Sequence, residues 1–595
     1  MLIVEVIDFK RHLDYNASRV IQLLLKREKR PPGKTLSRRR FLFGGKNNMR
    51  IALAQLNPTI GALDYNAAKI VEYYLQARQK KADLVVFTEL SLSGYPPRDL
   101  LNYNSFLEKE KNLLYNKILP LTAGGPPILI GATHQKDNRL YNAAFLLEHG
   151  AVKSVHLKTL LPFFDVFDEP RYFTSCTERR VEQLGNLPTA IAICEDIWND
   201  NEFFTSPLYD IDPLEQLFKG GTQLLINLSA SPYHLGKHKL RETMLPFLAK
   251  KHQCGIVYLN QVGGNDELIF DGSSLVYNNR GELIYRAAFC EEELFFVETE
   301  DLYRPAAEIT PPDRDDIETI SRLLQLGLKD YLSKTGFTKV VLGLSGGIDS
   351  AVVAALAARA VGAENVLGVL MPSPYSSTHS ISDAKALAEN LGIEYRVIEI
   401  NKPFQAYLET LNNNREPLMD LAEENLQARI RGDILMHLSC RENRLVLVPG
   451  NKSELAVGYC TLYGDMSGAL AVISDLTKTR VYELAKHINN NSSEELIPQN
   501  SINKTPSAEL SPGQTDQDSL PPYDVLDPIV EMFVEKNLSP AEIIAAGFDK
   551  ETVEKTTCLI DRAEYKRYQA APGFRVTEKA FGTGRRMPIA RGYNY

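Results

Sequence analysis

The chain has 595 residues, of which 44% are hydrophobic and 24% are charged, and its formal net charge is −8. This length exceeds what one hydrophobic core supports, so we expect two or more domains. The acidic balance and the lack of any apolar run near roughly 18 residues argue against nucleic acid and membrane as partners. Seven cysteines without a CxxC pair favour a reducing compartment, so we expect a cytoplasmic protein.

The first 48 residues differ from the rest of the chain in composition. They carry twelve Lys or Arg against four Asp or Glu, and they end in a polar joint at 44–48. Met49 then begins a short apolar run that is typical of the first strand of a domain. We interpret residues 1–48 as a basic extension, disordered or not native, without catalytic importance, and Met49 as the functional start.

Short apolar runs alternate with helical patterns between residues 49 and 302, which predicts a sheet-rich α/β domain. The predicted strands are Ile51–Leu56, Leu84–Glu89, Ile128–Thr133, Ala190–Cys194, Leu224–Leu228 and Ile256–Asn260, and the predicted helices are Tyr65–Lys80, Phe106–Leu119 and Lys237–Lys251. Asn278-Asn279-Arg280-Gly281 lies between two further strand-like runs and predicts a hairpin turn.

Three chemically active side chains, those of Glu89, Lys158 and Cys194, stand at the ends of predicted strands in this region. A cysteine attacks as its thiolate, and a neighbouring ammonium lowers the pKa of a thiol. A glutamate can take the thiol proton, protonate the leaving amine and then activate water. The three groups together can hydrolyse an amide through a thioester, although a lone strand cysteine is more often a small buried hydrophobe.

The segments around these residues resemble the nitrilase family. Phe87-Thr88-Glu89-Leu90 is similar to its glutamate motif, His156-Leu157-Lys158 to its lysine motif, and Ile193-Cys194-Glu195-Asp196-Ile197-Trp198 to its cysteine motif. The resemblance covers about 49–302, and it implies a four-layer αββα sandwich in which these three motifs supply the catalytic residues.

The resemblance is stronger to the branch of that family that uses glutamine. It implies a glutamine-binding set made of Phe164, Glu169, Ser231 and Lys237. For Ser231 the alternative is a plain turn at the end of a strand, and for Glu169 it is an ordinary surface charge.

Residues 303–316 are rich in proline and charge and lack periodicity, so we place the linker there and the second domain at 317–595. The order of strand- and helix-like runs is βαβαβ, with strands at Val366–Met371 and Tyr395–Ile400 around a helix at Ser382–Asn390. This order predicts a Rossmann-like, doubly wound parallel sheet with a nucleotide at its carboxyl edge. The GxGxxG fingerprint is missing, so we do not expect a dehydrogenase-type cofactor site.

The segment 345–350, Ser-Gly-Gly-Ile-Asp-Ser, joins an apolar run to an alanine-rich helical run. Gly346 and Gly347 permit a tight turn whose N–H groups, together with the positive helix end, can cradle phosphate. Asp349 can hold Mg²⁺, which prefers carboxylate and phosphate oxygens. The segment resembles the pyrophosphate loop of ATP pyrophosphatases, whereas a glycine turn without a ligand is the alternative. The resemblance implies an ATP-binding loop made of Gly343, Leu344, Ser345, Gly346, Gly347, Ile348, Asp349 and Ser350.

Later segments resemble the NAD synthetase family, and they are Glu424–Arg431, Gly450–Tyr459, Tyr463–Met466, Leu476–Thr479 and Glu564–Arg567. The resemblance implies further ATP contacts at Pro449, Lys478 and Ser507, deamido-NAD contacts at Asn425, Arg429, Glu454 and Lys566, and Mg²⁺ shared by Asp349 and Glu454. Pro449 departs from the family pattern, because a threonine is usual there. The polar segment 489–528 predicts a mobile loop, with Pro506–Leu510 similar to the family's nucleotide lid.

A thiol amidase and an adenylating domain in one chain predict glutamine-dependent amidation of deamido-NAD with ATP, giving NAD, glutamate, AMP and pyrophosphate. Neutral ammonia would pass between the two sites through a dry channel, and the resemblance implies a homo-oligomer. The alternatives are another glutamine-dependent, AMP-forming amide ligase, an RNA-modifying or RNA-binding protein, and a nitrilase-like scaffold with inactive sites. Against the RNA alternative, the sequence lacks basic stripes and zinc-type cysteine pairs.

Overall fold

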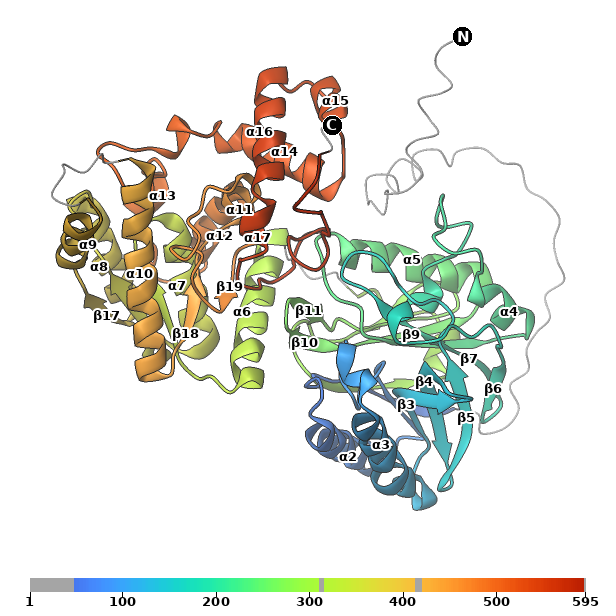
Figure 1. Cartoon of the computed structure of the whole chain (residues 1–595). Helices are drawn as coiled ribbons and strands as arrows, with labels where there is room; N and C mark the ends of the chain where they lie inside the picture. The colour runs from blue at the N-terminus through green and yellow to red at the C-terminus, as the bar shows by residue number, and fades with distance from the viewer. Residues whose placement is uncertain (1–47, 310–314, 413–419, 593–595) are drawn as a thin grey trace, which may run out of the picture. The chain divides into compact units, whose positions relative to one another are not determined.

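The computed structural model describes residues 48–309, 315–412 and 420–592 (Figure 1). It divides into two compact units. Unit 1 covers, within the described ranges, 48–263 and 270–309, and unit 2 covers 264–269, 315–412 and 420–592. The predicted extension, except for Asn48, lies outside the described residues, and so do residues 310–314 of the predicted linker.

Unit 1 is built from two six-stranded sheets and the helices that cover them. Its strands are β1 (Arg50–Gln55), β2 (Leu84–Phe87), β3 (Ile128–Lys136), β4 (Arg139–Glu148), β5 (Ala151–Leu157), β6 (Val181–Leu184), β7 (Leu187–Ile193), β8 (Leu224–Ser229), β9 (Gly255–Asn260), β12 (Leu275–Tyr277), β13 (Leu283–Arg286) and β14 (Glu293–Glu298). Its helices are α2 (Leu63–Gln79), α3 (Asn104–Leu113), α4 (Pro213–Lys219) and α5 (Lys237–His252). The sheets have the orders β14-β1-β2-β3-β4-β5 and β13-β12-β9-β8-β7-β6. A separate pair, β10 (Val262–Asn265) and β11 (Leu268–Asp271), forms a two-stranded sheet.

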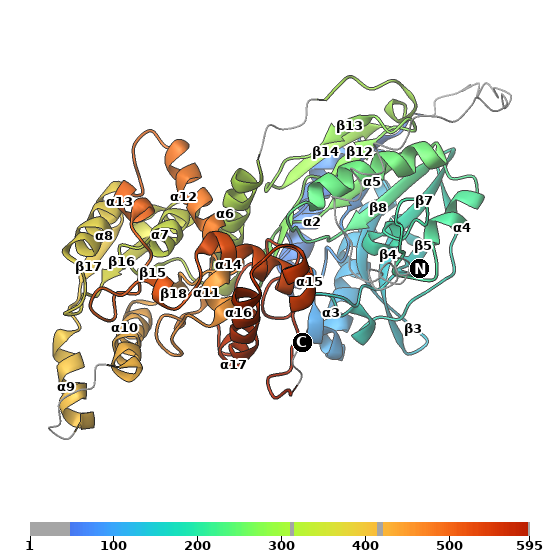
Figure 2. The same cartoon turned by 90° about the horizontal axis from the view of Figure 1, so that it is seen from above.

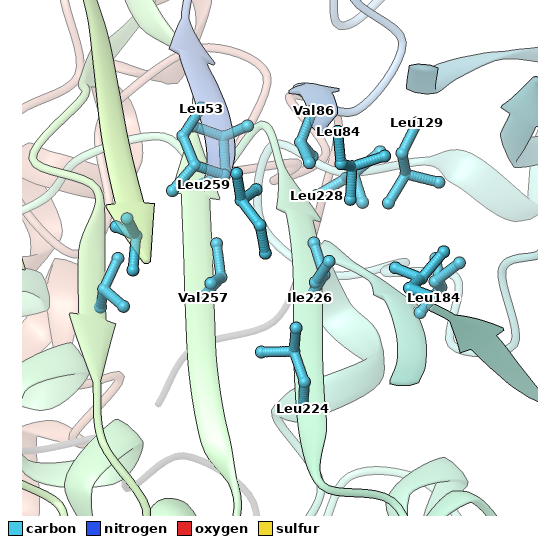
Figure 3. Close-up of a cluster of buried hydrophobic side chains, with 14 of the residues drawn as sticks. Leu53, Leu84, Val86, Leu129, Leu184, Leu224, Ile226, Leu228, Val257 and Leu259 are labelled. Atoms are coloured by element: carbon cyan, nitrogen blue, oxygen red, sulfur yellow. The ribbon is translucent and has the colours of Figure 1, made fainter. Parts of the chain in front are cut away.

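The alternation of side chains along the strands builds the layers. On β1, Ile51 and Leu53 join an apolar core that also contains Ile226 and Val257 of the second sheet (Figure 3). The intervening Ala52 and Ala54 face outward and pack with residues of α2. Because the outer face of the second sheet packs with α4 and α5, the result is the predicted αββα sandwich.

Most predicted elements of this unit are confirmed, with shifts of a few residues at their ends. The predicted hairpin is present, because β12 and β13 pair antiparallel around Gly281, whose φ is +69°. The predicted helix Phe106–Leu119 differs, since α3 ends at Leu113 and a π-helical turn, Leu114–Ile118, follows it.

Unit 2 contains one five-stranded sheet and many helices. The strands are β15 (Val340–Gly343), β16 (Val366–Leu370), β17 (Glu394–Val397), β18 (Leu445–Val448) and β19 (Leu470–Ala471). The helices are α6 (Asp316–Thr335), α7 (Ile348–Val361), α8 (Thr378–Leu391), α9 (Asn401–Asn412), α10 (Leu421–Glu442), α11 (Lys452–Val457), α12 (Lys478–Asn490), α13 (Gln499–Asn503), α14 (Tyr523–Val530), α15 (Pro540–Ala545), α16 (Lys550–Arg562) and α17 (Glu564–Arg567).

The sheet order is β17-β16-β15-β18-β19, and every pair is parallel. Residues of α9 and α10 pack on one face of the sheet, while α6, α7 and α12 pack together on the other (Figure 2). This is the predicted doubly wound arrangement. The strand order reverses between β15 and β18, which is where such sheets bind ligands.

The segment predicted as the mobile loop 489–528 contains more regular structure than expected. α12 continues to Asn490, α13 lies within the segment, and α14 begins at Tyr523. The prediction of a loop was therefore partly wrong, because a polar segment can still form short helices. None of the helices in the described part of the chain is long and apolar enough to cross a membrane.

Candidate functional site

The first candidate site is a buried cluster of three charges in unit 1. The Nζ atom of Lys158 lies 2.7 Å from an oxygen of Glu89 and 2.7 Å from an oxygen of Glu169. The exposed fractions of these residues are 1%, 0% and 5%, respectively. Burial alone would lower the pKa of Lys158, but the carboxylates of Glu169 and Glu89 outweigh burial and hold it well above its usual value. Lys158 therefore carries its charge at neutral pH. Because Glu169 is buried and contacts Lys158, it is part of this cluster and not a surface charge.

The charges of this cluster act on the pKa of the Cys194 thiol. Burial raises the pKa of Cys194 well above its usual value, the charge of Glu89 raises it further, and the charge of Lys158 lowers it. The resting thiol is therefore neutral, and a base must take its proton during attack. The backbone of Cys194 has φ +42°, in the left-handed region that non-glycine residues rarely adopt. Such strain occurs often at residues whose orientation matters for function.

The strand ends of both sheets build this cluster. Glu89 and Lys158 follow β2 and β5 of the first sheet, whereas Cys194 follows β7 of the second. Two contacts fix these ends against each other across the sandwich. The N–H of Ala230, after β8, donates to Glu89 at 2.8 Å. Asp196, two residues after the cysteine, accepts from the N–H groups of the two residues that follow Lys158, each at 2.9 Å.

The residues predicted to bind glutamine lie on several elements of unit 1. Ser231 is buried, and its carbonyl accepts from Arg241 of α5 at 3.0 Å. Lys237 begins α5, and its Nζ lies 3.9 Å from the ring centroid of Trp198. Phe164 packs edge-on against Phe167 with a centroid distance of 5.5 Å.

Sequence reasoning missed four polar residues of this site. Asn142 donates to Glu89 at 2.7 Å, and the hydroxyl of Tyr95 donates to Glu169 at 2.8 Å. Asp196 lies inside the cysteine motif, but the motif gave it no role of its own. Glu195 is buried, which raises its pKa, while the charge of Lys237 lowers it. Asn142 also gave a signal, since it is the polar residue within the apolar run 140–147 of β4.

A carboxylate and an ammonium next to each other suit the charged head of an amino acid. In this region the ammonium of Lys237 lowers the pKa of the buried Glu195 carboxyl, and the hydroxyl of Tyr209 donates to Glu195 at 3.1 Å. A free amino acid carries one ammonium and one carboxylate group, so it can pair with both side chains.

The second candidate site lies in unit 2, at the switch point of the parallel sheet. The turn after β15 brings Gly346 to φ +75°, and a Cβ at this position would lie 2.3 Å from the carbonyl oxygen of Ser380. Only glycine fits this conformation and this space. Gly347 caps α7 with an ordinary φ of −83°, so the positive helix end faces the turn, as expected for a phosphate loop.

A cavity of about 290 Å³ opens at this turn. The predicted ATP-binding residues that line it are Gly343, Leu344, Ser345, Gly347, Ile348, Asp349, Ser350, Pro449, Lys478 and Ser507, and Glu454 lines it as well. The Ser507 hydroxyl lies 3.1 Å from the N–H of Glu509, from which it accepts a hydrogen bond. The cavity therefore gathers residues from distant parts of the sequence.

Two carboxylates in the cavity converge on one ammonium. The Nζ atom of Lys478 lies 2.5 Å from Asp349 and 3.2 Å from Glu454. Burial raises the pKa of Glu454, whereas the charge of Lys478 lowers it. Because both carboxylates reach the same point, they are close enough to share a cation. One or two carboxylates plus phosphate oxygens form the usual magnesium site, so these residues fit Mg²⁺.

The described residues that line the cavity do not include Asn425, Arg429 or Lys566. These three instead surround the turn that follows α11. Asn425 accepts from the hydroxyl of Thr461 at 2.7 Å, and Arg429 donates to the carbonyl of Leu462 at 3.2 Å. The Nζ atom of Lys566 donates to two carbonyls of the same turn, each at 2.8 Å. The predicted deamido-NAD contacts, apart from Glu454, thus gather at this turn, whose Thr461 lines the cavity.

Comparison with known proteins assigns each unit to a family. Residues 50–307 match the Carbon-nitrogen hydrolase family, and residues 320–570 match the NAD synthase family. A Glutamine-dependent NAD(+) synthetase from Synechocystis sp. is 49% identical over 91% of this chain and 99% of its own length. The enzyme of the same name from Thermotoga maritima is 43% identical over 92% and 99% of the two chains.

A solved structure extends the comparison to three dimensions. The glutamine-dependent NAD+ synthetase from Acinetobacter baumannii, in complex with adenosine diphosphate, is 40% identical, with a TM-score of 0.73. The match covers 92% of this chain and 99% of that chain. With near-complete coverage of relatives at this identity, the chain belongs to the family of glutamine-dependent NAD(+) synthetases.

Proposed function

We propose that this protein converts deamido-NAD to NAD with ATP and with ammonia that it releases from glutamine. The observation that carries the proposal is the coexistence, in one chain, of a buried Cys194, Glu89 and Lys158 cluster and a phosphate-loop cavity. The first suits amide hydrolysis and the second suits nucleotide activation. An amide ligase that uses glutamine needs both.

In the first site, the sulfur of Cys194 attacks the side-chain amide carbon of glutamine while Glu89 takes the thiol proton. Glu89 then returns this proton to the leaving nitrogen, and ammonia departs as the thioester forms. The ammonium of Lys158 stabilises the oxyanion of the tetrahedral intermediate. Water, deprotonated by Glu89, attacks the thioester carbon, the carbon–sulfur bond breaks, glutamate leaves, and Glu89 returns the proton to the sulfur of Cys194. The raised pKa of the thiol supports this assignment, because Cys194 needs a base.

In the second site, a carboxylate oxygen of deamido-NAD attacks the α-phosphorus of ATP, and the bond to pyrophosphate breaks. Ammonia then attacks the resulting acyl-adenylate, AMP leaves and the amide of NAD forms. The amides of the 345–350 turn and Lys478 would stabilise the phosphates. Mg²⁺, held by Asp349 and Glu454, would neutralise charge on the pyrophosphate. We also propose that the enzyme is a cytoplasmic homo-oligomer.

Replacing Cys194 tests whether glutamine hydrolysis and amide synthesis take place at two separate sites. We expect Cys194→Ala to abolish NAD synthesis from glutamine and to leave synthesis from an added ammonium salt at about the wild-type rate. Cys254→Ala is the matched control, because Cys254 is a buried cysteine of the same unit outside the charge cluster. The measurement is NAD formation from deamido-NAD and ATP with each nitrogen source. Loss of both activities in Cys194→Ala alone would contradict the proposal.

The same assay identifies the acceptor. We expect deamido-NAD to support turnover and simple carboxylates to give no detectable product. Turnover of another carboxylate at a comparable rate would favour a different AMP-forming amide ligase.

A further inference from the structure

A polar strap forms one wall of the nucleotide cavity. We define the strap as residues 504–516, which follow α13. Members of the strap that line the cavity are Lys504, Pro506, Ser507, Ala508, Glu509, Leu510 and Asp516. Every residue from 503 to 515 is half-buried or exposed, whereas Ile502 and Asp516 at its two ends are buried. Burial therefore fixes the ends of the strap, and polar contacts must hold its middle in place.

The largest group of these polar contacts converges on Glu509. Its carboxylate accepts from the N–H of Ser377 at 3.2 Å, from the hydroxyl of Ser377 at 3.0 Å and from the hydroxyl of Ser380 at 2.6 Å. All three donors belong to the first turn of α8, of which Ser377 is the N-cap. A carboxylate is favoured at a helix N-terminus, because the first N–H groups lack partners within the helix and the dipole is positive there.

Other contacts of the strap are single hydrogen bonds. Lys504 donates to the hydroxyl of Ser380 at 2.9 Å, and Gln427 of α10 donates to the carbonyl of Leu510 at 2.9 Å. Before the strap, Ser501 of α13 donates to the carbonyl of Gly346 at 3.0 Å. α13 itself lies beside α8 (Figure 2). The carboxylate of Glu509 thus makes three of these bonds, and they are charge-assisted.

The backbone at Glu509 is held in an unfavourable conformation. Its φ is +49°, a value that costs free energy for a residue with a side chain. The hydrogen bonds to α8 therefore offset the free-energy cost of this backbone conformation. Without them, we expect the strap to leave the cavity wall. The same turn of α8 contains Ser380, whose carbonyl lies against Gly346. α8 consequently touches both the strap and the phosphate loop.

We propose that Glu509 is a positioning residue that latches the strap to α8 and so sets how tightly the cavity holds ATP. The proposal rests on the proposed use of ATP in this cavity. Glu509 need not touch the reacting atoms. It acts through the strap, which brings Lys504 and Ser507 to the cavity wall.

Kinetics with ammonium as the nitrogen source test the latch without the glutaminase site. We expect Glu509→Ala to raise the KM for ATP about ten-fold, because charge-assisted hydrogen bonds to α8 are lost. The kcat at saturating ATP should stay within about two-fold, since a released strap can still close on bound nucleotide. Glu509→Gln keeps an acceptor oxygen and should fall between the wild type and Glu509→Ala. Glu494→Ala, at an exposed glutamate just before the strap, is the control and should match the wild type.

Limited proteolysis provides a readout that does not depend on activity. Trypsin cleaves after Lys504, so a released strap should be cut there at least about ten-fold faster in Glu509→Ala than in Glu494→Ala. ATP should slow the cut in the wild type. An unchanged KM for ATP, or an unchanged cleavage rate after Lys504, would overturn the latch. A wild-type enzyme that formed no NAD from ATP and ammonium would instead overturn the proposed function.

Discussion

At the scale of single residues, the proposed glutaminase site depends on charges that are buried together. The ammonium of Lys158 is balanced by two carboxylates, and each member of the group is nearly inaccessible to water. Burial raises the pKa of Glu169, and the charge of Lys158 lowers it again. A buried charge is tolerated only with its partners, so removing one member leaves the others unpaired.

Removing the ammonium should therefore damage stability as well as chemistry. We expect Lys158→Met to abolish glutamine hydrolysis and to destabilise unit 1 by about 3–5 kcal/mol, because two buried carboxylates lose their cation. The double variant Lys158→Met with Glu169→Gln should recover much of the stability and none of the hydrolysis. Thermal melting of the full chain and glutamate release are the measurements. A Lys158→Met variant that melted like the wild type would rule out an essential ion cluster.

At the scale of elements, the turn from β15 to α7 carries the proposed phosphate contacts of the second domain. Gly346 is pressed against Ser380 of α8, and its φ is positive. Sequence alone indicates that glycine permits such a turn. The neighbouring helix makes glycine necessary, because it leaves no room for a Cβ atom.

The variant Gly346→Ala should reduce ATP-dependent synthesis by at least about 100-fold with either nitrogen source, since the new Cβ would displace the phosphate loop or α8. Gly336→Ala is the matched control. Gly336 also has a positive φ, +82°, but nothing lies within 4 Å of the position that a Cβ would take there. It should lose about 1 kcal/mol of stability and keep its activity. Equal activity of the two variants would show that the close approach at Gly346 is unimportant.

A contact between the edge strands β5 and β6 predicts that the stability of unit 1 depends on pH. Glu182 of β6 lies 3.3 Å from His156 of β5 and 3.0 Å from Arg180. Hydrogen bonding to His156 lowers the pKa of Glu182 to about 2. A carboxyl group with a depressed folded-state pKa stabilises the fold above its unfolded-state value, and this stabilisation is lost as the pH falls toward the folded-state value.

We expect Glu182→Gln to lower the stability of unit 1 by about 1–3 kcal/mol at pH 7, and the deficit should stay level down to about pH 5 and then shrink as the pH falls from about 4.5 toward about 2. The measurement is the melting temperature of the wild type and the variant across this range. Glu148→Gln, which breaks a partly exposed pair with Lys153, should change little at any pH. A deficit that stayed constant with pH would contradict the ionic origin.

At the scale of the whole molecule, the contacts that hold the first strand of unit 1 in its sheet begin at Asn48 and Met49. The N–H of Met49 donates to Thr299 at 2.9 Å, and the amide of Asn48 donates to Glu298 at 2.9 Å. From Arg50 onward, β1 pairs with β14. These contacts close the first sheet with residues from both ends of the unit.

A chain that begins at Met49 should therefore keep glutamine-driven and ammonium-driven synthesis within about two-fold of the full chain. Its melting temperature should fall by no more than about 2 °C, because only the contacts of Asn48 are lost from the described fold. Activity with both nitrogen sources and thermal melting are the measurements. Loss of either activity would assign residues 1–48 a role that their composition does not predict.

Local patterns predicted most strands and helices of both units and the glycine turn after β15, whereas the four-layer arrangement of unit 1 was implied by the nitrilase resemblance. The apolar alternation of β1 predicted its strand, and the glycines at 346–347 predicted the turn. The predictions were weaker where distant segments supply the partner. Asn142 and Tyr95 contact the charge cluster from elements that no local pattern connects to it. The helices within 489–528 were missed because their sequence is polar and their burial depends on other helices.

The sequence by itself determined the chemistry available to this protein: a thiol, an ammonium and a carboxylate in nitrilase-like motifs, and a serine-glycine loop before a helix. Residue types and short-range spacing are properties of the chain alone, so they can be found without coordinates. Only the tertiary structure decided that Glu169 joins the charge cluster and that Lys478 lies between Asp349 and Glu454. It also decided that the carboxylate of Glu509 accepts hydrogen bonds from the first turn of α8. These contacts join residues far apart in the chain, and only packing of the sheets and helices fixes the distances on which their energies depend.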